Sequence, residues 1–167
     1  MKKEKHENQN LSDKTKILTK LKLINLFKYL VYFLDRILCI FIKKPKKDLN
    51  AKKQVLILAN LGLGDAMNFL SVAEKYRKAY PKDKYEITLY VSNHLDELMK
   101  KETDFDNVEL VPFNQIVTDI KKRINLIKKI RKTYYTTVID IMGVTGCTPS
   151  MYLMAIAAAK ETFISVI

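Results

Sequence analysis

The sequence predicts an α/β protein, a Rossmann-like parallel sheet with helices on both faces, preceded by an amphipathic N-terminal helix. From residue 54 onward, short apolar runs rich in β-branched residues alternate with segments of helical periodicity. The connections between them are short, which favours right-handed crossovers between parallel strands. All four glycines follow the first or the fourth predicted strand, the sheet edge at which such folds bind ligands.

The basic charge is concentrated in the N-terminal third of the chain. The 167 residues carry a net charge of +12, but residues 1 to 53 hold 15 basic and 5 acidic side chains, whereas residues 54 to 167 hold 15 and 13. This distribution excludes a uniformly basic nucleic-acid-binding domain. Two cysteines, Cys39 and Cys147, provide neither a disulfide framework nor a paired metal-ligand spacing, so we expect no metal site and a reducing, cytoplasmic compartment.

Residues 1 to 16 are polar and are expected to form a disordered tail. Residues 17 to 47 are expected to form an amphipathic, basic helix, including the basic residues at its C-terminal end. Between residues 22 and 43, polar side chains recur every three or four positions and define a narrow arc, while leucine, isoleucine and phenylalanine fill the wider side. The sequence therefore predicts a helix of about six turns with one broad apolar face.

This helix could lie in one of three environments: across a membrane, in a membrane interface or against protein. A transmembrane span would bury Lys28, Asp35 and Arg36, each at a cost of about 2.5 to 3.5 kcal/mol near the bilayer centre. A position in the interface of an anionic membrane agrees better with the basic residues after the helix, and packing on protein is the other alternative. The predicted membrane contacts are Lys43, Lys44, Lys46 and Lys47. Residues 48 to 53 are expected to be a linker to a domain of residues 54 to 167.

The elements of that domain follow from periodicity and turn residues. Strands are expected at residues 55–59, 87–91, 108–111, 137–141 and 162–167. Helices are expected from residue 66 to Pro81, over 94–101 with His94 at the start, over 116–130 and over 150–159.

The loop after the first strand does not match known phosphate-binding patterns. Met67 stands where a dinucleotide fingerprint has its third glycine, and no acidic residue ends the second strand. No Gly-Lys-Ser/Thr of a P-loop follows either, and Asp65 at the helix entrance would repel a pyrophosphate. Asp65 has two interpretations: an N-cap that accepts a hydrogen bond from the amide of Met67 or Asn68, or a general base in a glycine-lined crevice.

Two stretches of the chain resemble glycosyltransferase family 9, the heptosyltransferase-like enzymes of lipopolysaccharide and surface-polysaccharide assembly. One is residues 55–70, with Leu-Gly-Leu-Gly-Asp-Ala at its centre. It is followed by Ala-Tyr-Pro at 79–81. The other is Tyr-Tyr-Thr-Thr-Val-Ile-Asp-Ile-Met-Gly at 134–143. The likeness extends over about 110 residues in order and spacing. Many members have Gln or His where this chain has Met142.

The resemblance implies the N-terminal half of a two-domain GT-B enzyme, with a nucleotide sugar as co-substrate and no further cofactor. Asp65 corresponds to the proposed base of a metal-independent inverting transfer, and a glycan or glycolipid is the acceptor. The nucleotide-sugar domain is missing from this sequence, so the chain is expected to be incomplete and inactive alone. The expected substrate contacts are Gly62, Gly64, Asn68, Asp140, Gly143, Thr145 and Gly146.

Two other functions compete with glycosyl transfer. One is a non-catalytic Rossmann-like binding module tethered at a membrane. The other is nucleic-acid binding through the basic segment 121–132, but its charges lie beside an isoleucine stripe, which is typical of a solvated outer helix face. We therefore expect no nucleic-acid partner.

Overall fold

The computed structural model describes residues 18–20, 22, 23, 26, 27, 30, 31, 33–42, 51–92, 94–116, 118–141 and 156, and the backbone of 161–164. The predicted tail, residues 48–50 of the predicted linker and the helix predicted at 150–159, apart from Ile156, lie outside this set. So do Lys43, Lys44, Lys46, Lys47, Gly143, Thr145 and Gly146.

The chain divides into two units, Met1–Ile37 and Leu38–Ile167. The described residues of the first unit, from Leu18 onward, are helical, as the sequence predicts. Their large apolar side chains are exposed, whereas Asp35 of the polar arc is buried. Within the described part of the chain, no helix combines the length and the apolar character that a membrane crossing requires.

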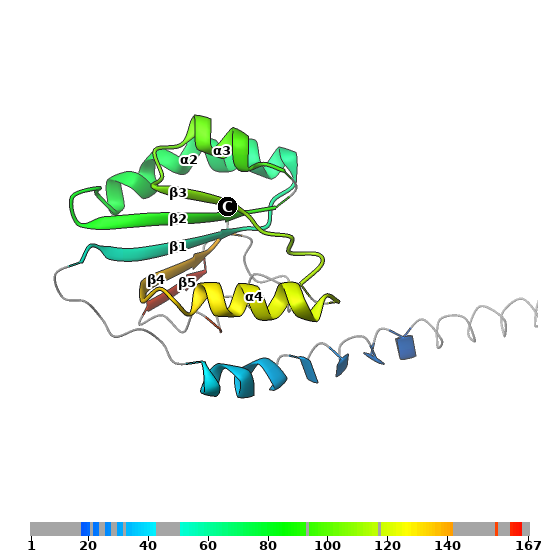
Figure 1. Ribbon diagram of the computed structural model, residues 1–167. Helices are drawn as coiled ribbons and strands as arrows, with labels where there is room; N and C mark the ends of the chain where they lie inside the picture. The colour runs from blue at the N-terminus through cyan, green and yellow to red at the C-terminus, as the bar shows by residue number, and fades with distance from the viewer. Residues whose placement is uncertain are drawn as a thin grey trace, which may run out of the picture. The chain divides into compact units, whose positions relative to one another are not determined.

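The second unit is built on a five-stranded, wholly parallel sheet (Figure 1). Its strands are β1 (Lys53–Ala59), β2 (Tyr85–Val91), β3 (Asn107–Leu110), β4 (Tyr135–Asp140) and β5 (Glu161–Ile164). The strand order is β3-β2-β1-β4-β5, so the chain winds outward from β1 in both directions. The predicted Rossmann-like parallel fold is confirmed, and β1 begins one residue inside the predicted linker.

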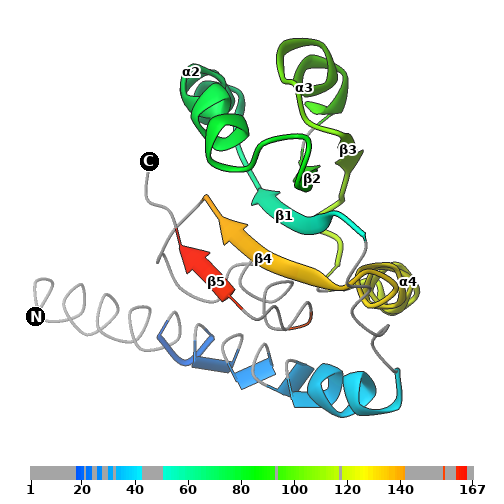
Figure 2. The same ribbon diagram turned by 90° about the vertical axis from the view of Figure 1, so that its left-hand side faces the viewer.

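Helices cover both faces of the sheet. Helices α2 (Leu63–Ala79) and α3 (Asp96–Glu102) lie on one face and α4 (Ile120–Ile130) on the other, as Figures 1 and 2 show. Alternate residues of β1 divide between two cores: Val55, Ile57 and Ala59 pack with α2 and α3, while Leu56 and Leu58 pack with α4. The continuous apolar run of β1 therefore serves both faces, as in other parallel sheets.

The predicted helix at 116–130 begins four residues later than expected. Asp119 is the N-cap of α4, and its side chain accepts a hydrogen bond from the Lys122 amide. Ile116 lies in the preceding turn, yet it is buried against the core. Because Ile116 continues the spacing of the helix isoleucines, the sequence pattern placed the start of the helix too early.

Arg77 of α2 joins the helix to the loop before β3. Its guanidinium donates to an Asp106 carboxylate oxygen at 2.7 Å and to the backbone oxygens of Asp104 at 2.8 Å and Tyr80 at 3.3 Å. Asp106 also accepts from the Ile87 amide. Partial burial acts to raise the pKa of Asp106, but the hydrogen bonds from Arg77 and Ile87 outweigh it and hold this pKa below its usual value.

We predict that Arg77→Met lowers the free energy of unfolding at pH 7 by about 2 kcal/mol, because it leaves the mostly buried Asp106 carboxylate without its cation. The adjacent control Lys78→Met breaks an exposed pair with Glu74 and should cost less than about 0.5 kcal/mol. Because the pKa of Asp106 is lowered in the folded state, its stabilisation is present above its unfolded pKa and is lost as the pH falls below about 4.

Urea unfolding at pH 7 and at pH 3 measures both effects. The difference between the wild type and Arg77→Met should shrink at pH 3. An equal loss of stability in the two methionine variants would contradict the assigned role of Arg77.

Candidate functional site

The strand order reverses at β1 and β4, and ligands of parallel α/β sheets commonly bind in a crevice above the carboxyl ends of such strands. The chain leaves β1 toward β2 through a helix on one face, whereas β4 on the other side of β1 is reached through α4 on the opposite face. At such a reversal the connections after two neighbouring strands run apart, and ligands bind between them. The connection after β1 contains Gly62, Gly64 and Asp65.

A buried hydroxyl holds the loop after β1 in place. Ser92 follows β2, is 2% exposed, and its Oγ donates to the backbone oxygen of Leu61 at 2.9 Å. Leu61 is itself buried, and the next residue, Gly62, is the N-cap of α2. The start of α2 is therefore fixed by a contact with the neighbouring loop.

The prediction that Asp65 caps the helix is wrong. The N-cap is Gly62, which makes no side-chain cap hydrogen bond, and Asp65 is the third residue of α2. Its side chain is exposed, and within the described residues no hydrogen bond or ion pair involves it. A carboxylate in the first turn is favoured by the helix dipole, but here it keeps all its acceptor capacity for a ligand.

The glycines beside Asp65 have no packing reason to be glycine. Gly62 has φ −77°, which any residue can adopt, and a Cβ there would meet only Asp65 Oδ2 at 3.8 Å. A Cβ on Gly64 would meet no atom of the described residues within 4 Å. Glycine inside a helix is less favourable than alanine, so Gly64 lowers stability with no gain in packing. Among the described residues, no contact accounts for glycine at this position.

The first turns of α2 also expose apolar surface. Leu63 is 67% exposed and Met67 is 56% exposed, one helical turn apart. Asn68, a predicted substrate contact, is exposed one turn after Asp65. The start of α2 thus presents a carboxylate, an amide and two apolar side chains together.

Asp140 differs from Asp65 because it is wholly buried at the end of β4, opposite Leu58 of β1. Asp140 takes part in an interaction within the protein. Its contact with a substrate stays a prediction. Gly143, Thr145 and Gly146, predicted to line the same crevice, lie outside the described residues.

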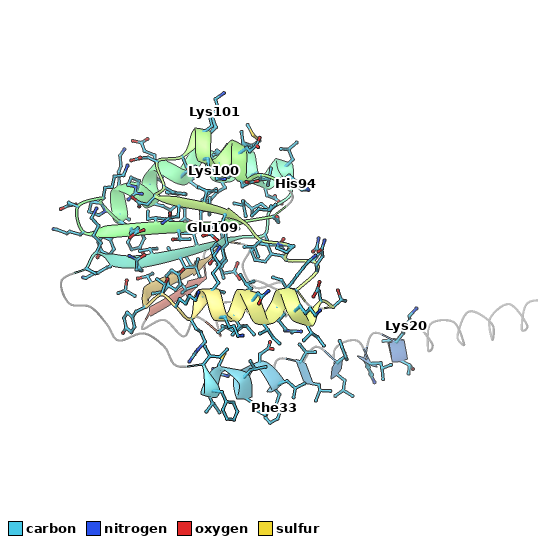
Figure 3. All side chains as sticks on the ribbon, viewed as in Figure 1. Lys20, Phe33, His94, Lys100, Lys101 and Glu109 are labelled. Carbon is cyan, nitrogen blue, oxygen red and sulfur yellow. The ribbon has the colours of Figure 1, made fainter. Side chains whose placement is uncertain are left out.

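Sequence reasoning missed the functional potential of His94. It precedes α3 by two residues and has φ 58°, a left-handed backbone conformation that is uncommon outside glycine. Its side chain is exposed, and it lies at the end of the molecule where α2 begins (Figure 3). Its imidazole is thus available to solvent at the same end of the sheet as the candidate site.

Among the described residues, no three His, Cys, Asp or Glu side chains are grouped so that they could hold a metal ion.

We predict that Gly64→Ala raises the free energy of unfolding by about 0.5 to 1 kcal/mol, since alanine is favoured in a helix and the added Cβ is unobstructed. Gly62→Ala should instead lower it by a similar amount, because alanine is a poor N-cap. Thermal and urea unfolding would measure both changes. A loss of stability in Gly64→Ala would show that packing requires this glycine.

Comparisons with known proteins give a likeness of structure only. No protein-family profile matches the sequence, and no curated protein matches it. Among solved structures, tyrosyl-tRNA synthetase from Leishmania major with tyrosinol is similar in its cubic form, with a TM-score of 0.44 and 11% identity over 80% of this chain and 35% of the synthetase. A triclinic form of the same synthetase gives a TM-score of 0.42 and 10% identity, over 75% of this chain and 27% of the synthetase. This chain thus covers about a third of the synthetase, which is not a glycosyltransferase. By its own strand order, it contains a Rossmann-like α/β domain.

Proposed function

We propose that this chain is the acceptor-binding half of an inverting, metal-independent glycosyltransferase that moves a sugar from a nucleotide sugar to a surface glycan or lipid-linked acceptor. The observation that carries the proposal is the exposed Asp65 carboxylate at the strand-order reversal, where no hydrogen bond within the described residues engages it. The resemblance of residues 55–70 and 134–143 to glycosyltransferase family 9 supplies the reaction class.

Asp65 would act as the general base. Its carboxylate takes the proton from an acceptor hydroxyl while that oxygen attacks the anomeric carbon of the donor sugar. The bond from the anomeric carbon to the nucleotide diphosphate breaks, and the diphosphate leaves with the bonding electron pair. Attack from the opposite side inverts the anomeric centre, so a single base on the acceptor side suffices.

The surroundings of Asp65 suit an acceptor of mixed polarity. The absence of a side chain at Gly64 lets a sugar ring approach the helix backbone, and the Asn68 amide can pair with its hydroxyls. Leu63 and Met67 offer apolar contact to a lipid portion of the acceptor or to a facing domain. The nucleotide of the donor would be held by a second domain across the crevice.

We also propose that the protein is peripheral to the inner face of the cell membrane, attached through residues 17 to 47. Most of the described large apolar side chains of this segment are exposed, among them Phe27 at 53% and Phe33 at 61%. The basic excess of residues 1 to 53 would attract anionic headgroups. A lipid-linked acceptor would be present at the same surface.

The alternative is a non-catalytic, membrane-tethered binding module. The burial of Asp140 favours it, because only one of the two predicted carboxylates is exposed at the crevice. The two functions differ in whether Asp65 must accept a proton.

We predict that Asp65→Asn lowers sugar transfer at least 100-fold, because the amide cannot accept the hydroxyl proton. The free energy of unfolding should change by less than about 1 kcal/mol, since only the charge at the start of α2 is lost. Transfer of radiolabel from a panel of nucleotide sugars to lipid and polymer is measured in membranes that contain the protein and its donor-binding partner.

The control Asp119→Asn alters the N-cap of α4 on the other face of the sheet and should leave transfer unchanged, because asparagine caps as well as aspartate. Retained transfer in Asp65→Asn, or no transfer by the wild type, would favour the binding module.

For the membrane attachment, we predict that replacing the four lysines between residues 43 and 47 with glutamine weakens flotation with anionic vesicles by at least tenfold at low salt. Raising the salt concentration should weaken the wild type in the same direction, because it screens the charges. Absence of salt-sensitive binding by the wild type would refute attachment to an anionic membrane.

A further inference from the structure

The last turn of the N-terminal helix, at the start of the second unit, is apolar and lies on the α4 side of the sheet. Ile40 is 78% exposed and Phe41 is 79% exposed. Their neighbours Cys39 and Ile42 pack against the core that α4 shares with β1 and β4. The exposed pair is therefore mounted on the Rossmann-like domain itself.

Arg131 fastens this turn to the domain. Its Nε donates to the backbone oxygen of Ile42 at 2.7 Å, and its Nη1 donates to the backbone oxygen of Ile156 at 3.3 Å. Arg131 is the C-cap of α4, so one guanidinium joins the end of α4, the apolar turn and the segment before β5. Because charge-assisted hydrogen bonds fix the turn, Ile40 and Phe41 keep a defined place relative to α4.

The exposed side of α4 carries lysines. Lys121 and Lys128 are two turns apart and lie opposite Ile127 and Ile130, which face the core. Lys132 is exposed just after the helix ends. Within the described residues, none of the three lysines takes part in an ion pair, so their charges are available to a partner.

The two helical faces of the domain differ in charge. Residues 111–134, which contain α4, hold seven basic residues and one acidic residue. Residues 63–84 and 92–106, which contain α2 and α3 on the opposite face, hold seven basic and eight acidic residues together. A negatively charged surface therefore meets attraction on the α4 side alone.

We propose that the α4 face of the domain rests on an anionic lipid bilayer, with Ile40 and Phe41 inserted among the lipids and Lys121, Lys128 and Lys132 on the headgroups. This inference rests on the proposed membrane attachment and adds its orientation. Apolar side chains flanked by lysines match the chemistry of an anionic interface, whereas a nucleic acid would leave Ile40 and Phe41 without an apolar partner.

The orientation has a consequence for the candidate site. With a helical face on the membrane, the strands run along the bilayer, and the crevice at their carboxyl ends opens sideways. About one helix layer, roughly 10 to 12 Å, separates the sheet from the lipid. Asp65 begins α2 on the face of the sheet away from the membrane, so an acceptor anchored in the membrane would reach it around the carboxyl ends of the strands.

Vesicle binding of two matched triple variants tests the charged part of this surface. Lys121, Lys128 and Lys132 are changed to glutamine in one, and the exposed Lys75, Lys84 and Lys101 of the other side are changed in the control. With vesicles of phosphatidylcholine and 30% phosphatidylglycerol at low salt, the first should bind about 100-fold more weakly, as expected for three lysine contacts, and the control less than threefold.

Tryptophan fluorescence tests the inserted turn, because the chain has no tryptophan of its own. Phe41→Trp should shift its emission to the blue with anionic vesicles and be quenched by brominated lipids. The control Lys101→Trp on α3, remote from α4 in Figure 3, should do neither.

Equal weakening by both triple variants, or equal quenching of both tryptophans, would overturn the orientation while leaving membrane attachment intact. No binding of the wild-type chain to anionic vesicles would overturn the attachment itself. A blue shift of Phe41→Trp without lipid that grows with protein concentration would identify a second copy as the occupant. Loss of binding to duplex DNA in the α4 variant, with vesicle binding retained, would identify a nucleic acid instead.

Discussion

The position of β1 at the centre of the sheet determines where everything else in the domain lies. Residues 55 to 59 have no solvent exposure, and β1 pairs in parallel with β2 on one side and β4 on the other. Parallel neighbours require helical crossovers, and a central strand requires them on opposite faces. The reversal above the end of β1 is thus a product of burying one apolar run on both faces. Because α2 follows β1 directly, the first turn of α2 with Asp65 lies at this reversal.

The fold was predictable because it depends on local periodicity. Apolar runs such as 55–59 and helical spacing such as that of α2 before Pro81 are visible in a single sequence. The start of α4 was not, because Ile116 is apolar for a tertiary reason: it fills the core under a turn. A buried position in a turn and a buried position in a helix are both occupied by an apolar residue, so the sequence pattern does not tell them apart.

The place of the candidate site was predictable, but its geometry was not. Glycines after two strands located the crevice, whereas the role of Asp65 depends on where α2 begins, and Ser92, 31 residues from Leu61 in sequence, helps to fix that point. The burial of Asp140 follows from its register with Leu58, and the left-handed backbone of His94 follows from the tight entry to α3. These are contacts between segments, which composition and spacing do not encode.

The contacts of the described residues do not explain two features of this chain. One is Gly64 in an unobstructed helical position, and the other is the outward pair Ile40 and Phe41. They lie on different parts of the domain, one at the strand ends and one on a helical face. In a parallel α/β domain these surfaces are at right angles, so one can be occupied while the other stays open. The proposed function needs this separation, because the surface proposed to hold the membrane must not close the crevice proposed to receive the substrate.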